Sequence, residues 1–228
     1  MTLRSATGLS CQHQARRGGR CIYSKFFSLK PEKQTRIINA AFKEFAQKGY
    51  VNASTNNIVK EAEISKGILF HYFNSKKELF LFLYDFTMDV LTKDYFGRLD
   101  ATSRDIFERL KQISSYKLEL TGRFPEMFNF IMVAHFEGSH EVREDLDKRN
   151  NQLLLQAYAK TYENIDPSPF KEGIDIKKAI EIINWTLEGF AVREQEKLKH
   201  SDNFEQELKN LFDRFDPYRD ILKKSFYK

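Results

Sequence analysis

Apolar residues of this 228-residue chain recur at the spacing of helices from Pro31 onward, and no stretch alternates apolar and polar residues as a half-buried strand would. Pro31 suits the first turn of a helix, and Gly49 suits the left-handed position just past a helix end. Between them, Ile38, Phe42 and Ala46 lie four residues apart and share one face. These features predict an all-α fold that opens with this helix.

Three further helix starts are predicted at Ser54, Ser65 and Ser75, because a serine side chain can accept hydrogen bonds from the free N–H groups at a helix N-terminus. The first two of these helices are short and are expected to end near Ala62 and His71. The third start, Ser75-Lys76-Lys77-Glu78, also matches the capping box. Helices spaced this tightly leave no room for the strand-helix-strand units of an α/β fold.

Glycine and proline divide the rest of the chain into longer predicted helices. One is expected over about Glu126 to Phe136, one over about Val142 to Tyr162 and one over about Ile174 to Lys197. The last helical region is expected to break at Asp216-Pro217, because proline removes a helix hydrogen bond and disfavours helix in the residue before it.

Positive charge is concentrated in the first third of the chain. Residues 1–30 hold six basic and no acidic side chains, residues 31–77 hold eight basic against four acidic, and residues 78–228 hold 23 against 28. This asymmetry is expected when one end of a protein meets a polyanion. Residues 1–24 are interpreted as a flexible basic tail; a minor-groove contact by Arg16, Arg17 and Arg20 is the alternative.

Other classes of protein find little support in the sequence. No apolar run reaches the ~20 residues of a membrane span and no secretory leader is recognised, so a cytoplasmic location is expected. Cys11 and Cys21 are interpreted as free thiols, and His135 and His140 lie on different helix faces, so neither a metal site nor a cofactor is expected. Catalytic motifs such as a nucleophile elbow or a glycine-rich phosphate loop are absent from the sequence.

Three helices with a tight turn between the second and third form a helix-turn-helix, whose last helix enters the major groove of DNA. Lys66, His71, Tyr72 and Lys76 cluster on and just after that last helix and supply donors for phosphate oxygens. Solvated lysines and partly buried aromatic residues are the alternative interpretations.

The stretch from Gly49 to Leu79, GYVNASTNNIVKEAEISKGILFHYFNSKKEL, resembles the DNA-binding signature of the TetR family. A hydroxyl pair opens the second helix at Ser54 and Thr55, the sequence Ser-Lys-Gly opens the third at Ser65, and an aromatic run ends at Phe73. The resemblance implies a DNA-binding site formed by Ser54, Thr55, Asn56, Ser65, Lys66, Gly67, Ile68, His71, Tyr72 and Lys76.

Four positions depart from the family pattern. Glu63 stands in the turn where glycine is usual; a residue held there at positive φ would cost roughly 1 kcal/mol, which leaves another turn geometry open. Val59 replaces a small residue, and Phe70 replaces a tyrosine and so removes one phosphate donor. Ile68 stands where threonine is frequent and favours contact with a thymine methyl group.

The resemblance further implies two domains and a mode of action. Residues 25–77 would form the helix-turn-helix domain, and residues 78–228 a helical domain that binds a small effector and forms a homodimer. Such a dimer would bind a palindromic operator in double-stranded DNA and leave it when the effector binds. No membrane partner is expected.

Candidate residues for the second domain come from its aromatic and apolar side chains. An apolar or aromatic effector is predicted to contact Phe124, Met127, Phe128, Ile131, Met132, His135, Tyr158, Tyr162 and Trp185. The dimer interface is predicted at Ile183, Leu187, Phe190, Leu208 and Phe212. The alternative for both sets is that they are core residues of one chain.

Three rival functions differ in what they predict. A DNA-architectural protein without an effector would bind DNA with little regard to sequence, whereas a regulator discriminates its site by roughly 10³-fold or more. A dimeric scaffold would have no use for a basic helix-turn-helix, and an enzyme would need catalytic motifs. A DNA-binding transcriptional regulator is therefore the function predicted from the sequence.

Overall fold

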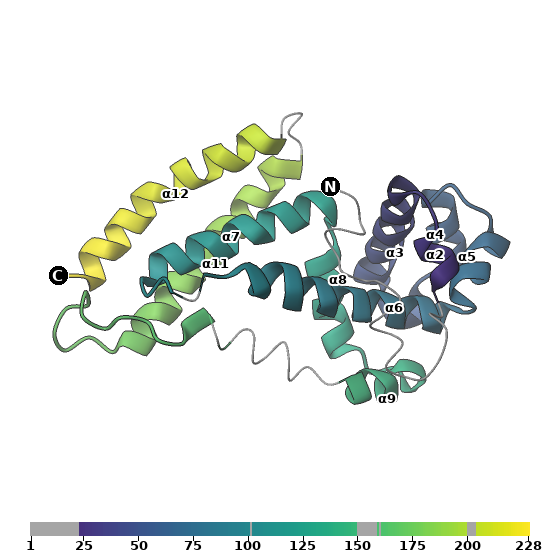
Figure 1. The fold of residues 1–228 in the computed structure, drawn as a ribbon, viewed down its shortest axis with the longest axis horizontal. Helices are drawn as coiled ribbons and strands as arrows, with labels where there is room; N and C mark the ends of the chain where they lie inside the picture. Colours follow the sequence, from purple (N-terminus) through teal and green to yellow (C-terminus); the bar gives the residue numbers. More distant parts are fainter. Residues whose placement is uncertain (1–22, 101, 150–158, 160, 200–203) are drawn as a thin grey trace. The chain divides into compact units, whose positions relative to one another are not determined.

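The computed structural model describes residues 23–100, 102–149, 159, 161–199 and 204–228. Within these ranges the chain is helical, with turns between the helices and one isolated bridge between Phe170 and Tyr227. The all-α prediction is therefore confirmed (Figure 1). The chain packs as two compact units: unit 1 comprises residues 1–98 and 119–159, and unit 2 comprises residues 99–118 and 160–228.

Unit 1 contains the helices from α2 to η3 and two that follow later. They are α2 (Ser24–Phe27), α3 (Pro31–Asn52), α4 (Thr55–Glu61), α5 (Lys66–Phe73), α6 (Lys76–Asp89), the π-helix η2 (Val90–Tyr95), the 3₁₀ helix η3 (Phe96–Arg98), α8 (Met127–Phe136) and α9 (His140–Arg149). Unit 2 contains α11 (Ile176–Lys199) and α12 (Phe204–Phe226). Helix α7 (Ile106–Arg123) belongs to unit 2 as far as Leu118 and to unit 1 from Glu119.

Two of the three predicted serine caps form, at the start of α5 and of α6, whereas Ser54 precedes α4 without a side-chain cap hydrogen bond. Ser65 Oγ accepts a hydrogen bond from the Ile68 N–H at 3.2 Å, and Ser75 Oγ accepts one from the Glu78 N–H at 3.1 Å. Only half of the predicted capping box forms, because the Ser75 N–H donates to the Phe73 carbonyl instead of to Glu78. The Glu78 carboxylate accepts a hydrogen bond from the Tyr23 hydroxyl at 3.1 Å.

Gly49 takes the positive φ that the sequence predicted, but as a kink within α3 and not past its end. Gly49 has φ 68°, and the helical assignment continues beyond this kink to Asn52. The left-handed conformation suits glycine because it has no Cβ. The Tyr50 N–H that follows donates to a Glu137 carboxylate oxygen at 2.8 Å, which ties the kink to the loop after α8.

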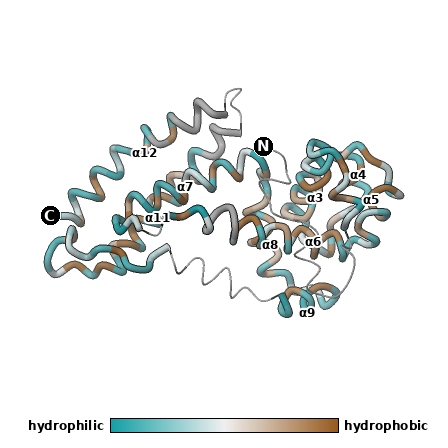
Figure 2. The backbone as a smooth tube through the Cα atoms, in the orientation of Figure 1, coloured by the Kyte–Doolittle hydropathy of each residue, from teal (hydrophilic) through white to brown (hydrophobic). Residues whose placement is uncertain are grey.

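Aromatic side chains form much of the core of unit 1. Helices α3 and α8 lie side by side, and the apolar residues of α8 appear as a brown stretch in Figure 2. Phe42 is fully buried and contacts Phe86, Phe124 and Phe130, with ring centroids 6.2 Å apart or closer. Edge-to-face and tilted ring pairs of this kind add stabilisation beyond the buried area.

Unit 1 extends past residue 77, the boundary predicted for the helix-turn-helix domain. Lys77 pairs with Asp145 at 2.7 Å and Asp85 with Arg149 at 2.9 Å, so α9 is fastened to α6 in the same unit. The assignment of effector binding and dimerisation to residues 78–228 remains a prediction. Residues 1–22 of the predicted tail lie outside the described residues.

Unit 2 packs α11 against α12, with the first part of α7 in the same core (Figure 1). Phe107, Ile183 and Leu222 are buried there. Arg109 is 1% exposed, and its guanidinium donates to the carbonyls of Ser103, Thr161 and Glu163. This one side chain therefore holds together the two loop segments of unit 2.

The predicted break at Asp216-Pro217 is wrong, because α12 runs through Pro217. Proline removes one backbone hydrogen bond from a helix interior, yet Leu211, Phe215 and Leu222 keep helical spacing on both sides of it. Leu211 and Leu222 are buried and Phe215 packs against the unit 2 core, so tertiary packing holds the helix across the proline.

For some of the sequence predictions, only part of the residues concerned is described by the structure. The helix predicted from Val142 to Tyr162 begins at His140 as α9, which ends at Arg149; residues 150–158 and 160 lie outside the described part of the chain. No helix within the described residues is long and apolar enough to cross a membrane. Nor do three or more metal-ligating side chains gather anywhere in that part, which does not include Cys11 and Cys21.

Candidate DNA-binding surface

Helices α4 and α5 pack through the apolar residues that the sequence predicted. Ile58 on α4 and Leu69 and Phe73 on α5 are at most 1% exposed, and Ile64 in the turn is half-buried against the same core. Leu69 and Phe73 are four residues apart, so burying them fixes which face of α5 points outward. The two helices and their turn thus form a helix-turn-helix that packs against α3.

The turn between α4 and α5 takes the left-handed conformation at Glu63. Its φ is 51°, one of three positive values at non-glycine residues in the described part of the chain. Arg36 on α3 supports this turn, since its Nε donates to the Ala62 carbonyl at 2.9 Å and its Nη1 lies 3.3 Å from the Glu63 carboxylate. The turn therefore takes a positive φ without glycine, and the alternative turn geometry left open by the sequence does not occur.

The outward face of α5 carries most of the predicted DNA contacts. Lys66, Gly67, Ile68 and His71 are all exposed. Gly67, Ile68 and His71 occupy the face of the helix opposite the buried pair of Leu69 and Phe73, and Lys66 is exposed in the first turn. An apolar side chain 37% exposed at Ile68, between basic and polar neighbours, is suited to a thymine methyl group.

Ser54 and Thr55, at the start of α4, and Tyr72 are less exposed to solvent than the outward residues of α5. Asn56 is exposed, whereas Ser54 and Thr55 are half-buried, and the Ser54 N–H already donates to a Glu44 carboxylate oxygen at 2.8 Å. Tyr72 is half-buried beside Phe26, with ring centroids 6.1 Å apart. A contact of Ser54, Thr55 or Tyr72 with DNA would therefore use the side-chain hydroxyl group, because the Ser54 N–H is already bonded to Glu44.

Lys76 has an internal role that the sequence did not reveal. Its Nζ donates to the Val51 carbonyl at 3.1 Å and to the Ala53 carbonyl at 3.3 Å, and it lies 4.7 Å from the centre of the Tyr50 ring. An ammonium group has three donors, so these two bonds occupy most of its capacity. Contact between Lys76 and DNA stays a prediction, and its visible role is to fix the loop before α4.

The predicted effector residues are divided between the two units. Phe124 and Met127 are fully buried in the unit 1 core, Phe128 and Ile131 pack against it, and Met132 and His135 are exposed. In unit 2, the Tyr162 hydroxyl donates to Asn184 and Trp185 is 64% exposed. Tyr158 lies outside the described residues.

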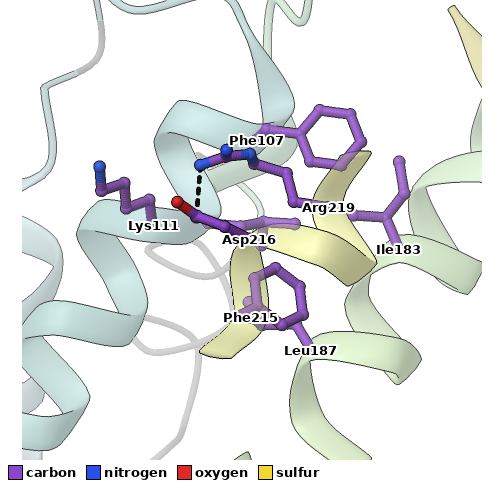
Figure 3. A pocket seen from close by; sticks show the side chains of 8 residues that line it. Phe107, Lys111, Ile183, Leu187, Phe215, Asp216 and Arg219 are labelled. Carbon is purple, nitrogen blue, oxygen red and sulfur yellow. Dashed lines mark ion pairs between the residues drawn. The ribbon is translucent and has the colours of Figure 1, made fainter. Parts of the chain in front are cut away.

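A small hollow in unit 2 has a lining that the sequence did not predict (Figure 3). Its volume is about 20 Å³, the room that one water molecule needs. Phe107, Leu110 and Phe215 line it with apolar surface, and Arg219 pairs with Asp216 at 2.6 Å at its polar side. A ligand larger than a water molecule would not fit this hollow without movement of the residues that line it.

Of the predicted dimer residues that the structure describes, Ile183 and Leu187 belong to the unit 2 core. Ile183 is 1% exposed, Leu187 and Phe190 are half-buried, and the side chains of Leu208 and Phe212 lie outside the described set. A different set of apolar residues on the same two helices is exposed: Ile182, Trp185 and Val192 on α11, and Tyr218 and Ile221 on α12.

Sequence reasoning missed the side chains that hold the helix-turn-helix in place. Glu44 and Glu137 each accept from a backbone N–H in the α3–α4 segment, and Tyr23 bonds to Glu78. Their partners are 10 to 87 residues away along the chain, so no local spacing reveals them. The aromatic character of Tyr23 and Phe26 was the one local signal that could have revealed this packing, but residues 1–24 were interpreted as a flexible tail, and Tyr23 is in fact 4% exposed.

Comparison with known proteins finds sequence similarity in the part of the chain that contains the helix-turn-helix. Residues 37–83 match the family model described as bacterial regulatory proteins, tetR family. The chain is 32% identical over 140 residues to the uncharacterized HTH-type transcriptional regulator YuxN of Bacillus subtilis, an alignment that covers 59% of this chain and 46% of YuxN. The matched part thus spans about half the length of that relative.

Two more proteins share sequence or fold over a longer part of the chain. The fatty acid metabolism regulator protein of Bacillus subtilis is 24% identical over 166 residues, covering 70% of this chain and 81% of that protein. The crystal structure of a TetR family transcriptional regulator from Chloroflexus aurantiacus aligns with a TM-score of 0.55 and 22% identity, over 90% of this chain and 97% of that one. That alignment shows a common fold.

Proposed function

We propose that this chain, a member of the TetR family of bacterial regulatory proteins, represses transcription by binding a palindromic operator as a homodimer and leaves that operator when a small effector binds. Its family is one of transcriptional regulators, so the enzyme considered from the sequence is set aside. The exposed face of α5 is the observation on which the proposal rests.

That face combines the features required for reading a base sequence. Leu69 and Phe73 fix the rotation of α5, and the outward residues Lys66, Ile68 and His71 combine charge, apolar surface and a hydrogen-bonding ring. A helix presented in this way can enter the major groove, where each base pair displays its own pattern of donors, acceptors and methyl groups.

The DNA-binding proposal is tested by selecting binding sites for the full-length protein from a randomised duplex library. We expect a palindrome with half-sites about 34 Å apart, and a preference over random duplex of roughly 10³-fold or more. Enrichment of no sequence, with tight binding to all duplexes, would instead support the architectural alternative.

Substitutions on α5 then connect the selected sequence to this surface. Ile68→Ala is expected to relax the preference at one base pair in each half-site, with a loss of about 1–3 kcal/mol against the preferred base. Lys48→Ala is the matched control, because Lys48 is exposed on α3 and should leave the preference unchanged. Selection of the same palindrome by Ile68→Ala with undiminished preference would contradict a role for this face.

Dimerisation is proposed to use the exposed apolar stripe on α11 and α12. Ile182, Trp185 and Val192 follow one another at intervals of three and seven residues and therefore share one face of α11. Tyr218 and Ile221 extend the apolar surface on α12. A second copy of the chain, packed through the same stripe, would bury these side chains in a four-helix interface.

Effector binding is proposed to act on α6, which begins at the DNA-binding helices. Phe86, near the C-terminal end of α6, and Val90, just after that end, are buried in the unit 1 core with Phe124. A ligand that binds among these residues would have to displace them. By linkage, operator DNA would weaken the binding of that ligand by the same factor. The relative named as a fatty acid metabolism regulator supports acyl-chain compounds as the first to be tested.

Calorimetric titration of acyl-chain compounds, with and without operator duplex, tests this part of the proposal. An effector should bind more weakly in the presence of the duplex. Equal affinity in both titrations would exclude release by that compound while leaving the assignment of DNA binding unchanged.

A further inference from the structure

Gly67 stands on the outward face of the recognition helix at a position where the fold itself does not require glycine. It lies in the first turn of α5, is exposed and does not have a positive φ. A Cβ built on it would meet no atom of the described residues nearer than the Ser65 Oγ at 4.0 Å, an ordinary van der Waals distance. Gly49, in contrast, has φ 68° and so has a backbone reason to be glycine. Because alanine favours helix more than glycine does, an alanine would fit this fold at least as well.

Ile68, the next residue, adds an exposed apolar side chain to the same face. It is 37% exposed, and its N–H donates to the Ser65 Oγ at 3.2 Å, which fixes the first turn of α5. Leu69 and Phe73 are at most 1% exposed and orient the helix from its other side. The N-terminal residues of a recognition helix are those that reach base edges in the major groove. In this chain they offer the bases a backbone without a side chain, next to a branched apolar side chain.

One kind of group in the major groove matches this pair of residues. The edges of guanine, adenine and cytosine present hydrogen-bond donors and acceptors there, whereas thymine adds a methyl group at C5. An isoleucine packed against donors and acceptors would leave them unpaired, which costs binding energy. The absence of a Cβ at Gly67 lets the helix backbone come close to the base edge. A 5-methyl group is therefore the feature of a base that Gly67 and Ile68 are suited to contact.

We propose that Gly67 and Ile68 recognise the 5-methyl group of a pyrimidine in each half-site of the operator; this rests on the proposed function. Two bases of DNA carry that group, thymine and 5-methylcytosine, and both present it at the same place in the major groove. Methylation of cytosine at the contacted position therefore strengthens binding. The surface thus responds to the methylation of a C·G pair as well as to the presence of a T·A pair.

Removal of single methyl groups from the DNA tests this assignment. In the palindrome selected by the full-length protein, each thymine is replaced in turn by uracil, which lacks the methyl group and keeps the same hydrogen bonds. At one thymine of each half-site, the replacement should weaken binding about fourfold, and roughly 15-fold when both half-sites carry it, as expected for one buried methyl-sized group in each. Half-sites without a T·A pair, or unchanged binding at every replaced thymine, would overturn the proposal.

Cytosine at the same position supplies the second arm of the experiment. The T·A pair identified by uracil is replaced by a C·G pair and by a 5-methylcytosine·G pair, two duplexes that differ only in the methyl group. The methylated duplex should bind about fourfold more tightly than the unmethylated one. Equal affinity for the two would mean that the surface recognises thymine by some other feature, against the proposal.

Two variants connect the methyl group to this pair of residues. Ile68→Ala should bind the thymine and uracil duplexes with nearly equal affinity, whereas Lys48→Ala, an exposed substitution on α3, should keep the wild-type difference. Gly67→Ala should resist urea at least as well as the wild type, yet bind the thymine duplex roughly tenfold more weakly, because the added methyl group holds the base edge away. Wild-type affinity in Gly67→Ala, or an undiminished difference in Ile68→Ala, would assign the contact to other residues.

Failure of this inference differs from failure of the proposed function. A protein for which no palindrome is enriched refutes the function proposed above. A protein that selects a palindrome but binds its uracil form equally well refutes only the contact with the methyl group.

Discussion

At the scale of single residues, the helix-turn-helix is held by side chains whose neighbours are distant in sequence. Lys76 donates to two carbonyls at the end of the α3 segment, and Glu44 and Glu137 accept backbone N–H groups on either side of the same loop. These charge-assisted hydrogen bonds satisfy backbone groups that no helix satisfies. Glu63, in contrast, adopts a conformation that is costly for its residue type.

Glu63→Gly is expected to stabilise the protein relative to Glu63→Gln. Both substitutions remove the ion pair with Arg36, but only glycine is free of strain at φ 51°. The left-handed conformation costs about 1–2 kcal/mol in a residue with a Cβ, and the flexibility of glycine in the unfolded chain offsets part of the gain. Urea unfolding at fixed protein concentration should show the glycine variant more stable by about 0.5–1 kcal/mol. A glutamine variant of equal stability would mean that Glu63 is not strained.

At the scale of helices, packing decides where an element continues and which elements join one unit. Helix α12 passes through Pro217, and α9 is fastened to α6 by Lys77 with Asp145 and by Asp85 with Arg149. The hydrogen bond from Lys77 holds the pKa of Asp145 below its ordinary value of 3.8, and the hydrogen bond to Asp145 raises the pKa of Lys77.

Pro217→Ala is expected to stabilise the protein, because it restores a hydrogen bond to α12 and removes a ring clash. Proline in a helix interior costs about 3 kcal/mol, and its restriction of the unfolded chain returns up to about 1 kcal/mol, which leaves a gain of roughly 2 kcal/mol. Pro167→Ala, in an exposed loop, is the control and should lower stability slightly. Thermal unfolding of both variants measures the difference; equal effects would show that α12 does not remain helical across residue 217.

Asp145→Asn should destabilise the protein at neutral pH but not at low pH. A carboxyl group with a depressed pKa contributes stability above its unfolded value of 3.8, and this stability is lost as the pH falls through the lower folded value. The pair is one-third exposed, so the difference at about pH 7 should stay near or below about 1 kcal/mol. Urea unfolding at about pH 7 and pH 3 tests this. Asp147→Asn, in the exposed pair with Arg143, is the control, and a gap for Asp145→Asn that persisted at low pH would exclude the ion pair as its cause.

At the scale of the whole molecule, the proposed regulator depends on two copies of the chain acting together. Recognition helices in successive major grooves must be held at a fixed spacing. Large apolar side chains exposed on α11 and α12, among them Trp185 at 64% and Ile221 at 63%, supply a surface that a second copy would cover.

The variant Trp185→Glu with Ile221→Glu is expected to be monomeric and to lose operator affinity. Burying two carboxylates without partners in an apolar interface costs several kcal/mol. Sedimentation should give about twice the chain mass of 26.9 kDa for the wild type and the single chain mass for the variant. Phe136→Glu replaces an exposed aromatic residue of unit 1 and should remain dimeric. A double variant that stayed dimeric would place the interface elsewhere.

What the sequence determined by itself was local. Helical periodicity, the caps at Ser65 and Ser75, Gly49 and the motif from Gly49 to Leu79 predicted the all-α fold and the resemblance to the TetR family, because capping and amphipathic spacing depend on residues within four positions of one another. The buried faces of α4 and α5 followed from the same spacing. The tertiary structure decided the rest: the bond from Tyr23 to Glu78, the internal role of Lys76, the continuity of α12 and the division into two units. These depend on which distant segments pack together, and packing can outweigh a local preference of a few kcal/mol.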